Sequence, residues 1–325
     1  MRIAFFGLPL AACLLHADGH EIAYAGLSRP SPGMRRLKRV LAGAGGKAQV
    51  VLKPDVNATR TIEQVRSVAP DLVVSWFWTT KLPPELTSLA AKGAFGVHPS
   101  LLPRHRGPDP YFWAIDSGDE TTGVTAHLIA GEYDTGAILA QRSLAIDPTW
   151  NAWDLARALD RPSLSLLRTL ARDLWAREIA QDEAAATLAP APADEELEID
   201  WTWTSARIAR RIRAASPSPG AWTFFGEEPV TITRAEPALK FPRALLPGEA
   251  AVEGDVAVVR TGDGALALLA GRMDAAEGEE PHELDAGDIK ALIEEMTAEE
   301  EEEEEAEKEE EADDVADVGE APPRA

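Results

Sequence analysis

The chain has 325 residues, of which 45% are hydrophobic, and its formal net charge is −23. This length allows two domains with cores of their own, and no apolar run approaches the ~20 residues that span a bilayer. The single cysteine, Cys13, excludes an intrachain disulfide and fits the reducing cytoplasm, where we expect the protein to reside. The apolar opening "IAFFGLPLAACLL" runs into a second strand-like segment, which favours the start of an α/β domain over a signal peptide.

The first half of the chain alternates between predicted strands and predicted helices. Strands are expected at 2–8, 20–26, 49–54 and 71–78, with helical segments at 9–19 and 61–70 and a basic helix or loop at 34–46 between them. This order predicts an α/β fold with a doubly wound, mostly parallel, Rossmann-like sheet. In such sheets a ligand binds beyond the carboxyl ends of the strands.

The remainder of the predicted first domain extends to residue 181. A helix at 83–93 precedes a short strand, and further strands are expected at 122–131 and 137–146. Residues 151–178 form an amphipathic helical pattern that we expect to be interrupted near Pro162. Residues 182–198 are rich in proline and small residues, which predicts a linker.

A second domain is expected at 199–273, followed by a tail. A helix at 205–215 precedes short β segments separated by glycine-containing turns, a pattern typical of a small, OB-like barrel. Residues 274–325 hold 24 acidic and 3 basic residues, a net charge of −21, whereas residues 1–273 have a net charge of −2. We expect this acidic tail to be disordered, either as a solubilising segment or as an arm for a basic protein partner.

Three motifs carry chemistry, in the order "HPSLLPRHRG" (98–107), "TGVT" (122–125) and "DTG" (134–136). With the strand "RIAFFGLP" before them and "GDGALALLAG" after them, they resemble the formyltransferases that use formyl-tetrahydrofolate. That family includes enzymes that act on methionyl-tRNA and on amino sugars. The resemblance covers residues 1 to about 273 and implies a Rossmann-like formyltransferase domain with a C-terminal barrel.

The resemblance implies a catalytic asparagine, histidine and aspartate. His98 and Asp134 match the last two, but Gly96 stands where the asparagine is expected. In the implied reaction an amine attacks the formyl carbon, His98 takes the amine proton as general base, and Asp134 orients the imidazole. The missing amide would have donated a hydrogen bond to the developing oxyanion, and losing one such donor costs roughly 100- to 1000-fold in rate.

The same resemblance implies a binding site for 10-formyltetrahydrofolate as formyl donor, without a metal. The residues expected to bind this donor are Trp76, Phe77, Trp78, Ser100 and Leu101. Arg104 and Arg106 lie in the motif loop and are candidates for binding an anionic group of the substrate. His127 lies on a predicted strand, and a structural role is the expectation for it.

The acceptor is less well defined than the donor. Residues 199–273 hold 9 basic and 8 acidic residues, so this domain lacks the positive charge that favours a nucleic acid. We therefore expect a small amine as substrate, such as a nucleotide-linked amino sugar. The alternatives are methionyl-tRNA as acceptor, hydrolysis of the formyl donor, and a pseudoenzyme that binds a ligand or regulates a partner with the acidic tail.

Overall fold

The computed structural model describes residues 1–43, 48–226, 228–273 and 281–298. The chain divides into two compact units, Met1–Pro192 and Ala193–Ala325. The boundary falls inside the segment 182–198 that the sequence predicts as a linker. Residues 182–192 belong to the first unit, where Arg106 donates its backbone N–H to Thr187 and accepts one from Ala189.

The first unit contains a seven-stranded sheet in the order β3-β2-β1-β4-β5-β6-β7. Its strands are β1 (Arg2–Gly7), β2 (Glu21–Leu27), β3 (Gln49–Leu52), β4 (Leu72–Trp76), β5 (Ala94–His98), β6 (Thr121–Leu128) and β7 (Ile138–Ala145). The first five strands pair in parallel, whereas β6 and β7 are antiparallel. The mostly parallel, Rossmann-like sheet predicted from the sequence is therefore confirmed.

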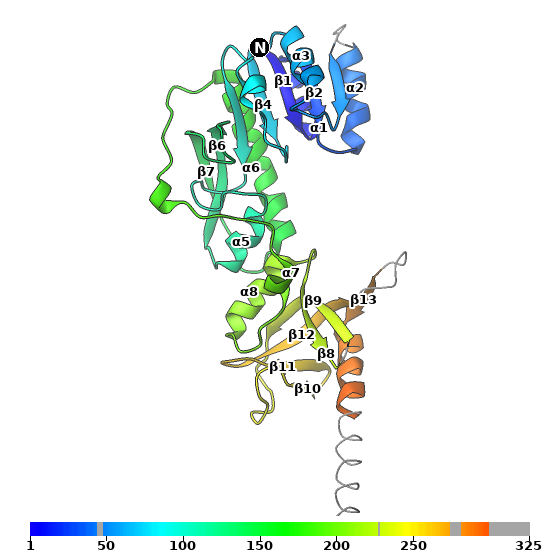
Figure 1. The fold of residues 1–325 in the computed structure, drawn as a ribbon. Helices are drawn as coiled ribbons and strands as arrows, with labels where there is room; N and C mark the ends of the chain where they lie inside the picture. The colour runs from blue at the N-terminus through cyan, green and yellow to red at the C-terminus, as the bar shows by residue number, and fades with distance from the viewer. Residues whose placement is uncertain (44–47, 227, 274–280, 299–325) are drawn as a thin grey trace, which may run out of the picture. The chain divides into compact units, whose positions relative to one another are not determined.

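Among the described residues of the first unit, five helices lie between these strands in the chain, and α6 follows the last strand (Figure 1). They are α1 (Pro9–Ala17), α2 (Pro32–Gly43), α3 (Thr59–Ser67), α4 (Pro84–Thr87), α5 (Pro110–Asp116) and α6 (Ala152–Asp173), with a short 3-10 helix at Glu183–Ala185. The helix α6 packs against β5, β6 and β7. It continues through Pro162, so the predicted interruption is wrong. Burial of leucines before and after the proline, such as Leu159 and Leu166, offsets the ~3 kcal/mol that an internal proline costs.

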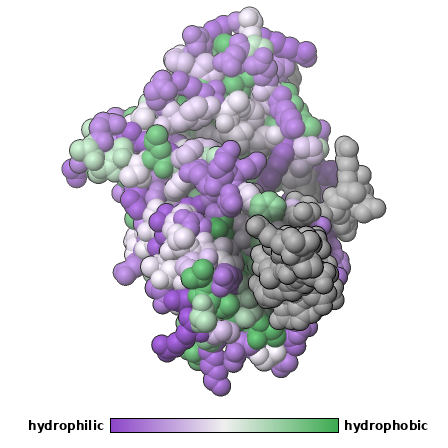
Figure 2. Space-filling model, turned by 60° about the horizontal axis from the view of Figure 1, so that its bottom comes forward, coloured by the Kyte–Doolittle hydropathy of each residue, from purple (hydrophilic) through white to green (hydrophobic). Residues whose placement is uncertain are grey.

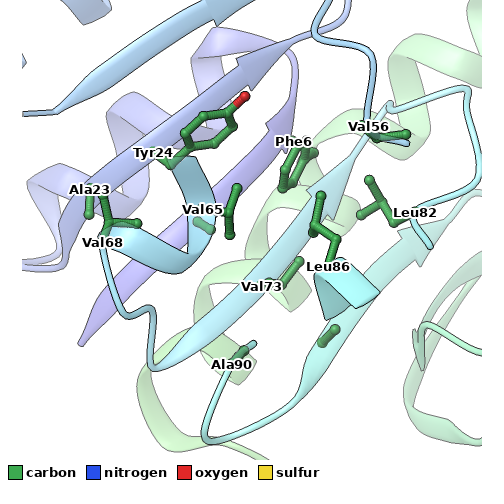
Figure 3. Close-up of a cluster of buried hydrophobic side chains, with 12 residues drawn as sticks. Phe6, Ala23, Tyr24, Val56, Val65, Val68, Val73, Leu82, Leu86 and Ala90 are labelled. Carbon is green, nitrogen blue, oxygen red and sulfur yellow. The ribbon is translucent and has the colours of Figure 1, made fainter. Parts of the chain in front are cut away.

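A hydrophobic core lies between the first strands and the helices α3 and α4 (Figure 3). Phe6 of β1, Tyr24 of β2 and Val73 of β4 meet Val65 and Leu86 from the helices, all of them fully buried. Full burial of such a side chain contributes about 1.5–3 kcal/mol. Burial also raises the pKa of the Tyr24 hydroxyl to about 12. This core fixes β1 and β4 side by side, so that both strands end at the same edge of the sheet.

The second unit is an antiparallel half-barrel preceded by two helices. The helices are α7 (Asp194–Leu197) and α8 (Ser205–Ala215), and the strands are β8 (Ala221–Phe225), β9 (Glu228–Pro237), β10 (Ala250–Glu253), β11 (Val256–Arg260), β12 (Ala265–Met273) and β13 (His282–Asp285). The strand order is β10-β11-β12-β9-β8, and β13 also pairs with β12. The predicted C-terminal barrel-like domain is confirmed.

Part of the predicted acidic tail has regular structure, which corrects the expectation for 281–298. The strand β13 pairs with β12, and residues 286–298 are helical. Leu284, Ile289 and Ile293 are buried, so three apolar residues bind this acidic segment to the half-barrel despite its charge. The rest of the predicted tail, 274–280 and 299–325, lies outside the described residues.

The surface drawn in Figure 2 is mainly hydrophilic, with hydrophobic residues scattered among the polar ones. Large apolar side chains exposed on the second unit include Phe224, Leu239 and Leu246. Within the described ranges, no helix has the length and apolar composition needed to cross a bilayer.

Candidate active site

A cavity of about 490 Å³ opens in the first unit beyond the carboxyl ends of β4 and β5. Its lining includes Phe77, Trp78, Gly96, His98, His127 and Asp134. The volume lies in the range typical of small-molecule sites, and the position is the one expected for a ligand in a parallel α/β sheet. The three motif positions Gly96, His98 and Asp134 therefore come together in one cavity wall.

Strand pairing gives Gly96 its neighbours. In the register of the sheet it pairs with Ser75 of β4 on one side and with His127 of β6 on the other. A Cβ placed on Gly96 would lie 3.5 Å from the Cβ of Ser75 and 3.9 Å from Nε2 of His127. These are ordinary van der Waals distances, so the backbone here leaves room for a side chain that the sequence does not supply.

His98 ends β5 and is almost fully buried. Its Nε2 lies 2.8 Å from the carbonyl oxygen of His105, which can only accept, so Nε2 carries the proton and donates it. Its Nδ1 lies 3.5 Å from Oδ2 of Asp134. The nitrogen that remains for proton transfer is therefore Nδ1, on the side of the carboxylate.

Asp134 is held in a sharply turned loop between β6 and β7. Its φ of 56° lies in the left-handed region, which aspartate tolerates better than most residues. Oδ2 accepts a hydrogen bond of 3.0 Å from the backbone N–H of Gly107, and Oδ1 lies 3.5 Å from Nε2 of His127. One carboxylate thus stands between two imidazoles, those of His98 and His127.

Two motif glycines make this geometry sterically possible. At Gly107 an added Cβ would lie 2.6 Å from the carbonyl oxygen of Ala189, and its φ of 128° disfavours any side chain. At Gly136 an added Cβ would lie 1.8 Å from the carbonyl oxygen of Leu128. The glycines of "RHRG" and "DTG" therefore allow the close backbone approach that brings Asp134 to the two rings.

Gln181 holds the loop that contains Asp134 through hydrogen bonds to its backbone. Its Nε2 donates to the carbonyl oxygens of Asp134 and Gly136, each at 2.7 Å. Its Oε1 in turn accepts from the guanidinium of Arg106 at 2.8 and 3.0 Å. Arg106 also pairs with Glu183, so one buried arginine ties the motif loop to the segment after α6.

His127 is buried, and the hydrogen bonds to its ring determine its neutral tautomer. Nδ1 lies 2.9 Å from the carbonyl oxygen of Leu128, so Nδ1 carries the proton and Nε2 faces Asp134. Burial lowers the pKa of this imidazole, the charge of Asp134 opposes that shift, and the nearby His98 adds to it. The expected structural role for His127 overlooked that its ring lines the cavity.

The cavity also has an aromatic and polar wall that suits a heteroaromatic ligand. Phe77 is partly exposed, and Trp78 and Tyr111 also belong to the lining. Aromatic faces in the lining of one cavity suit a flat heteroaromatic ring, as a folate has.

Trp76, Ser100 and Leu101 were also expected to bind the donor, but they do not line this cavity. Trp76 is buried in the core and donates from Nε1 to the Ser163 hydroxyl at 2.7 Å, and the Ser100 hydroxyl donates to the carbonyl of Arg104. Neither belongs to the cavity lining, and Leu101 lines a separate, smaller hollow.

The two loop arginines both hold carboxylates. Arg104 forms two hydrogen bonds with Asp119, and Arg106 binds Gln181 and Glu183. Neither arginine is in the lining of the 490 Å³ cavity. Binding of an anionic substrate group by these side chains stays a prediction.

Sequence reasoning missed three residues of the site. Gly107 was read as part of a motif rather than as the donor to Asp134, and Gln181 ended the predicted domain without a role. The position of His127 opposite Gly96 depends on the antiparallel register of β5 and β6, for which the sequence carries no local signal. Within the described residues no group of three or more His, Cys, Asp or Glu side chains is arranged so that it could hold a metal ion.

Comparison with known proteins identifies the class of this fold and site. Residues 43–169 match the Formyl transferase family, and residues 193–285 match the Formyl transferase C-terminal domain. Methionyl-tRNA formyltransferase of Solibacter usitatus (strain Ellin6076) is 33% identical over 282 residues, which cover 83% of this chain and 90% of that protein. The chain belongs to the formyltransferase family, whose common chemistry is formyl transfer from a folate-type donor.

Solved structures show the same fold at lower identity. HypX from Aquifex aeolicus in complex with tetrahydrofolic acid matches with a TM-score of 0.59 and 21% identity over 89% of this chain, which spans only 46% of HypX. The sugar 3N-formyl transferase WlaRD, crystallised with dTDP and 5-N-formyl-THF, matches with a TM-score of 0.60 and 15% identity over 82% of this chain and 97% of WlaRD.

Proposed function

We propose that this protein transfers a formyl group from 10-formyltetrahydrofolate to the amino group of a small molecule, such as a nucleotide-linked amino sugar. The observation that carries the proposal is the Asp134 carboxylate 3.5 Å from Nδ1 of His98 in the wall of a 490 Å³ cavity, in a chain of the formyltransferase family. The aromatic wall around Phe77 and Trp78 would hold the folate. The reacting carbon would lie near Gly96.

His98 and Asp134 have distinct roles in this reaction. The amine attacks the formyl carbon and becomes positively charged, and Nδ1 of His98 takes its proton. Asp134, fixed by the N–H of Gly107, stabilises the imidazolium that results. The proton then passes to the folate nitrogen as the carbon–nitrogen bond breaks.

The proposal is tested by measuring release of tetrahydrofolate from 10-formyltetrahydrofolate with and without a panel of amines. Release that depends on a nucleotide-linked amino sugar, with appearance of its N-formyl product, is the expected result. His98→Ala and Asp134→Asn should each reduce the rate by 100-fold or more. Release without any amine would indicate a hydrolase instead. No release and no thermal stabilisation by a formyl-folate analogue would reject both enzymatic functions.

Methionyl-tRNA is the second candidate acceptor. The Solibacter usitatus relative carries that name and matches over 90% of its length, including the C-terminal domain. The near-neutral charge of residues 199–273 opposes it. Formylation of methionyl-tRNA that falls steeply between low and high salt, in the absence of reaction with amino sugars, would favour this acceptor.

Gly96→Asn tests the missing oxyanion donor directly. The room around Gly96 accepts a Cβ, so the amide should fit, and it should raise kcat by up to roughly 100-fold if no other group donates to the oxyanion. Gly96→Ala, which fills part of the same space without a donor, is the matched control and should not raise kcat. An unchanged kcat in folded Gly96→Asn would mean that another group already supplies the donor.

A further inference from the structure

The space beside Gly96 is bordered by an imidazole nitrogen. Gly96 and His127 are direct partners in the antiparallel ladder of β5 and β6, so their side chains lie on the same face of the sheet. Nε2 of His127 is 3.9 Å from the Cβ position of Gly96. Both residues line the cavity, so a group bound next to Gly96 also meets this nitrogen.

The hydrogen bonds of the two histidines determine which ring nitrogen of each is protonated. Each ring already donates one N–H to a backbone carbonyl, His98 to His105 and His127 to Leu128. Each therefore turns its second nitrogen toward the carboxylate of Asp134, at 3.5 Å. If both nitrogens were unprotonated, two lone pairs would face a carboxylate, whereas one added proton makes at least one of these contacts attractive.

The arrangement allows the two rings to differ in charge. With the added proton on Nε2, His127 is an imidazolium whose donor nitrogen lies 3.5 Å from Oδ1 of Asp134 and 3.9 Å from the Cβ position of Gly96. Burial lowers the pKa of this ring against the opposing charge of Asp134, so the donor form gains weight as pH falls below the ordinary pKa of histidine. His98 then keeps a free lone pair on Nδ1, which its role as base requires. A single carboxylate can thus support one acid and one base at the same time.

We propose that His127 replaces the absent asparagine, donating from its protonated Nε2 to the oxyanion that forms beside Gly96. This inference rests on the proposed function, because the oxyanion belongs to that reaction. His127 becomes a catalytic residue in addition to the expected histidine and aspartate. The group beside it, Ser75, is the competing donor, since its side chain flanks Gly96 from β4.

The step balances with the groups present. The amine lone pair forms the new carbon–nitrogen bond and the carbonyl π pair moves to oxygen, where Nε2–H of His127 donates a hydrogen bond. The ammonium proton goes to Nδ1 of His98. When the bond to the folate nitrogen breaks, that nitrogen receives the proton from His98, and His127 ends as it began.

The protonation state can be measured without substrate, by ¹⁵N NMR of the histidine rings in the free protein between about pH 4 and 9. The groups facing the His127 ring are Asp134 and His98, with the carbonyl of Leu128 on Nδ1. Neutral His127 should carry its proton on Nδ1 and gain the second on Nε2, at lower pH in Asp134→Asn than in the wild type. An Nε2–H tautomer of the neutral ring, or no second protonation, would overturn the inference.

The second test is a double-mutant cycle that measures kcat for His127→Leu, Gly96→Asn and the double variant. His127→Leu should lower kcat roughly 100- to 1000-fold in the wild-type background but less than about 10-fold when Asn occupies position 96. His127→Gln, which keeps an amide donor, should retain more activity than His127→Leu. The loss of kcat with rising pH that comes from deprotonation of His127 should disappear in Gly96→Asn.

Ser75→Ala is the matched control and should change kcat by less than about 3-fold. Equal losses from His127→Leu in both backgrounds would assign it a structural role, and a large loss in Ser75→Ala would assign the donor to Ser75. Either result overturns the inference while leaving formyl transfer intact. If the wild type transfers no formyl group, the proposed function is wrong. The NMR titration is a separate test, because an Nε2–H tautomer or the lack of a second protonation of His127 contradicts the donor role whether or not formyl transfer occurs.

Discussion

The position of the Asp134 carboxylate depends on residues far from it in sequence. Its loop is held through carbonyl groups by Gln181, 47 positions away, and its side chain by the N–H of Gly107. A residue in the left-handed region, as Asp134 is, stays there only when its surroundings impose that conformation. The side-chain amide of Gln181 supplies this constraint without touching the cavity.

Gln181→Ala should therefore impair the site although the side chain is only half-buried and lies outside the cavity lining. The variant loses two hydrogen bonds to the Asp134 loop and leaves the Arg106 guanidinium with fewer acceptors. We expect a loss of about 1–3 kcal/mol in the free energy of unfolding, measured by urea denaturation, together with a lower kcat. Gln49→Ala on the edge strand β3 is the control, and equal effects of both substitutions would contradict this account.

The strand β13 and the helical residues 286–298 are regular structure in a segment whose acidic composition predicts disorder. Nine acidic residues between Asp274 and Glu295 led to the expectation of a disordered tail. The spacing of Leu284, Ile289 and Ile293 was the counter-signal, because these three side chains are buried. Burial of a few apolar residues decides the structure, while the charges remain in solvent on the other faces.

A chain ending at Met273 should consequently be less stable than one ending at Ala298. The shorter chain loses the β13 pairing with Arg272 and Met273 and exposes the surface that Ile289 and Ile293 cover. The point variant Ile293→Ala should cost about 2–5 kcal/mol in the second unit, as buried isoleucines do. Thermal unfolding is the measurement, and equal melting temperatures for the two chain lengths would show that this segment adds nothing.

The order of strands and helices was predictable because each has a local pattern. Buried parallel strands such as 72–76 read as short apolar runs, and the motif glycines mark the turns around the site. Two features had no local pattern. The pairing of Gly96 with His127 depends on the register between strands, and the anchoring of residues 187–190 depends on tertiary hydrogen bonds. Both are decided by contacts between distant segments.

Stability of the folded protein should fall between pH 7 and pH 5 because of buried imidazoles. Burial lowers the pKa of His20, His105 and His127. The unfolded chain binds their protons near pH 6.5 and the folded chain binds them only at lower pH, so stability is lost as pH falls below that value. Each imidazole contributes at most about 1.4 kcal/mol per pH unit.

His105→Asn isolates one of these contributions. Asparagine tolerates the φ of 61° at this position, so the backbone can be kept. Burial raises the pKa of Asp109 and Asp160, which acts in the opposite direction, and both carboxyls are present in wild type and variant alike. Urea unfolding at pH 5 and 7 should show a smaller pH dependence in the variant. An unchanged dependence would mean that His105 is protonated equally in the folded and unfolded chain.

The hydrogen bonds between the motif loop and residues 187–190 have a consequence for biosynthesis. The loop that follows His98 is fixed by Thr187 and Ala189, and Trp113 donates to the carbonyl of Pro190. All strands of the first sheet end by Ala145, but these contacts can form only after more than 40 further residues have been synthesised. On the ribosome the sheet can therefore assemble before its reactive cleft does, so the nascent chain becomes competent for chemistry only when the second unit begins to be translated.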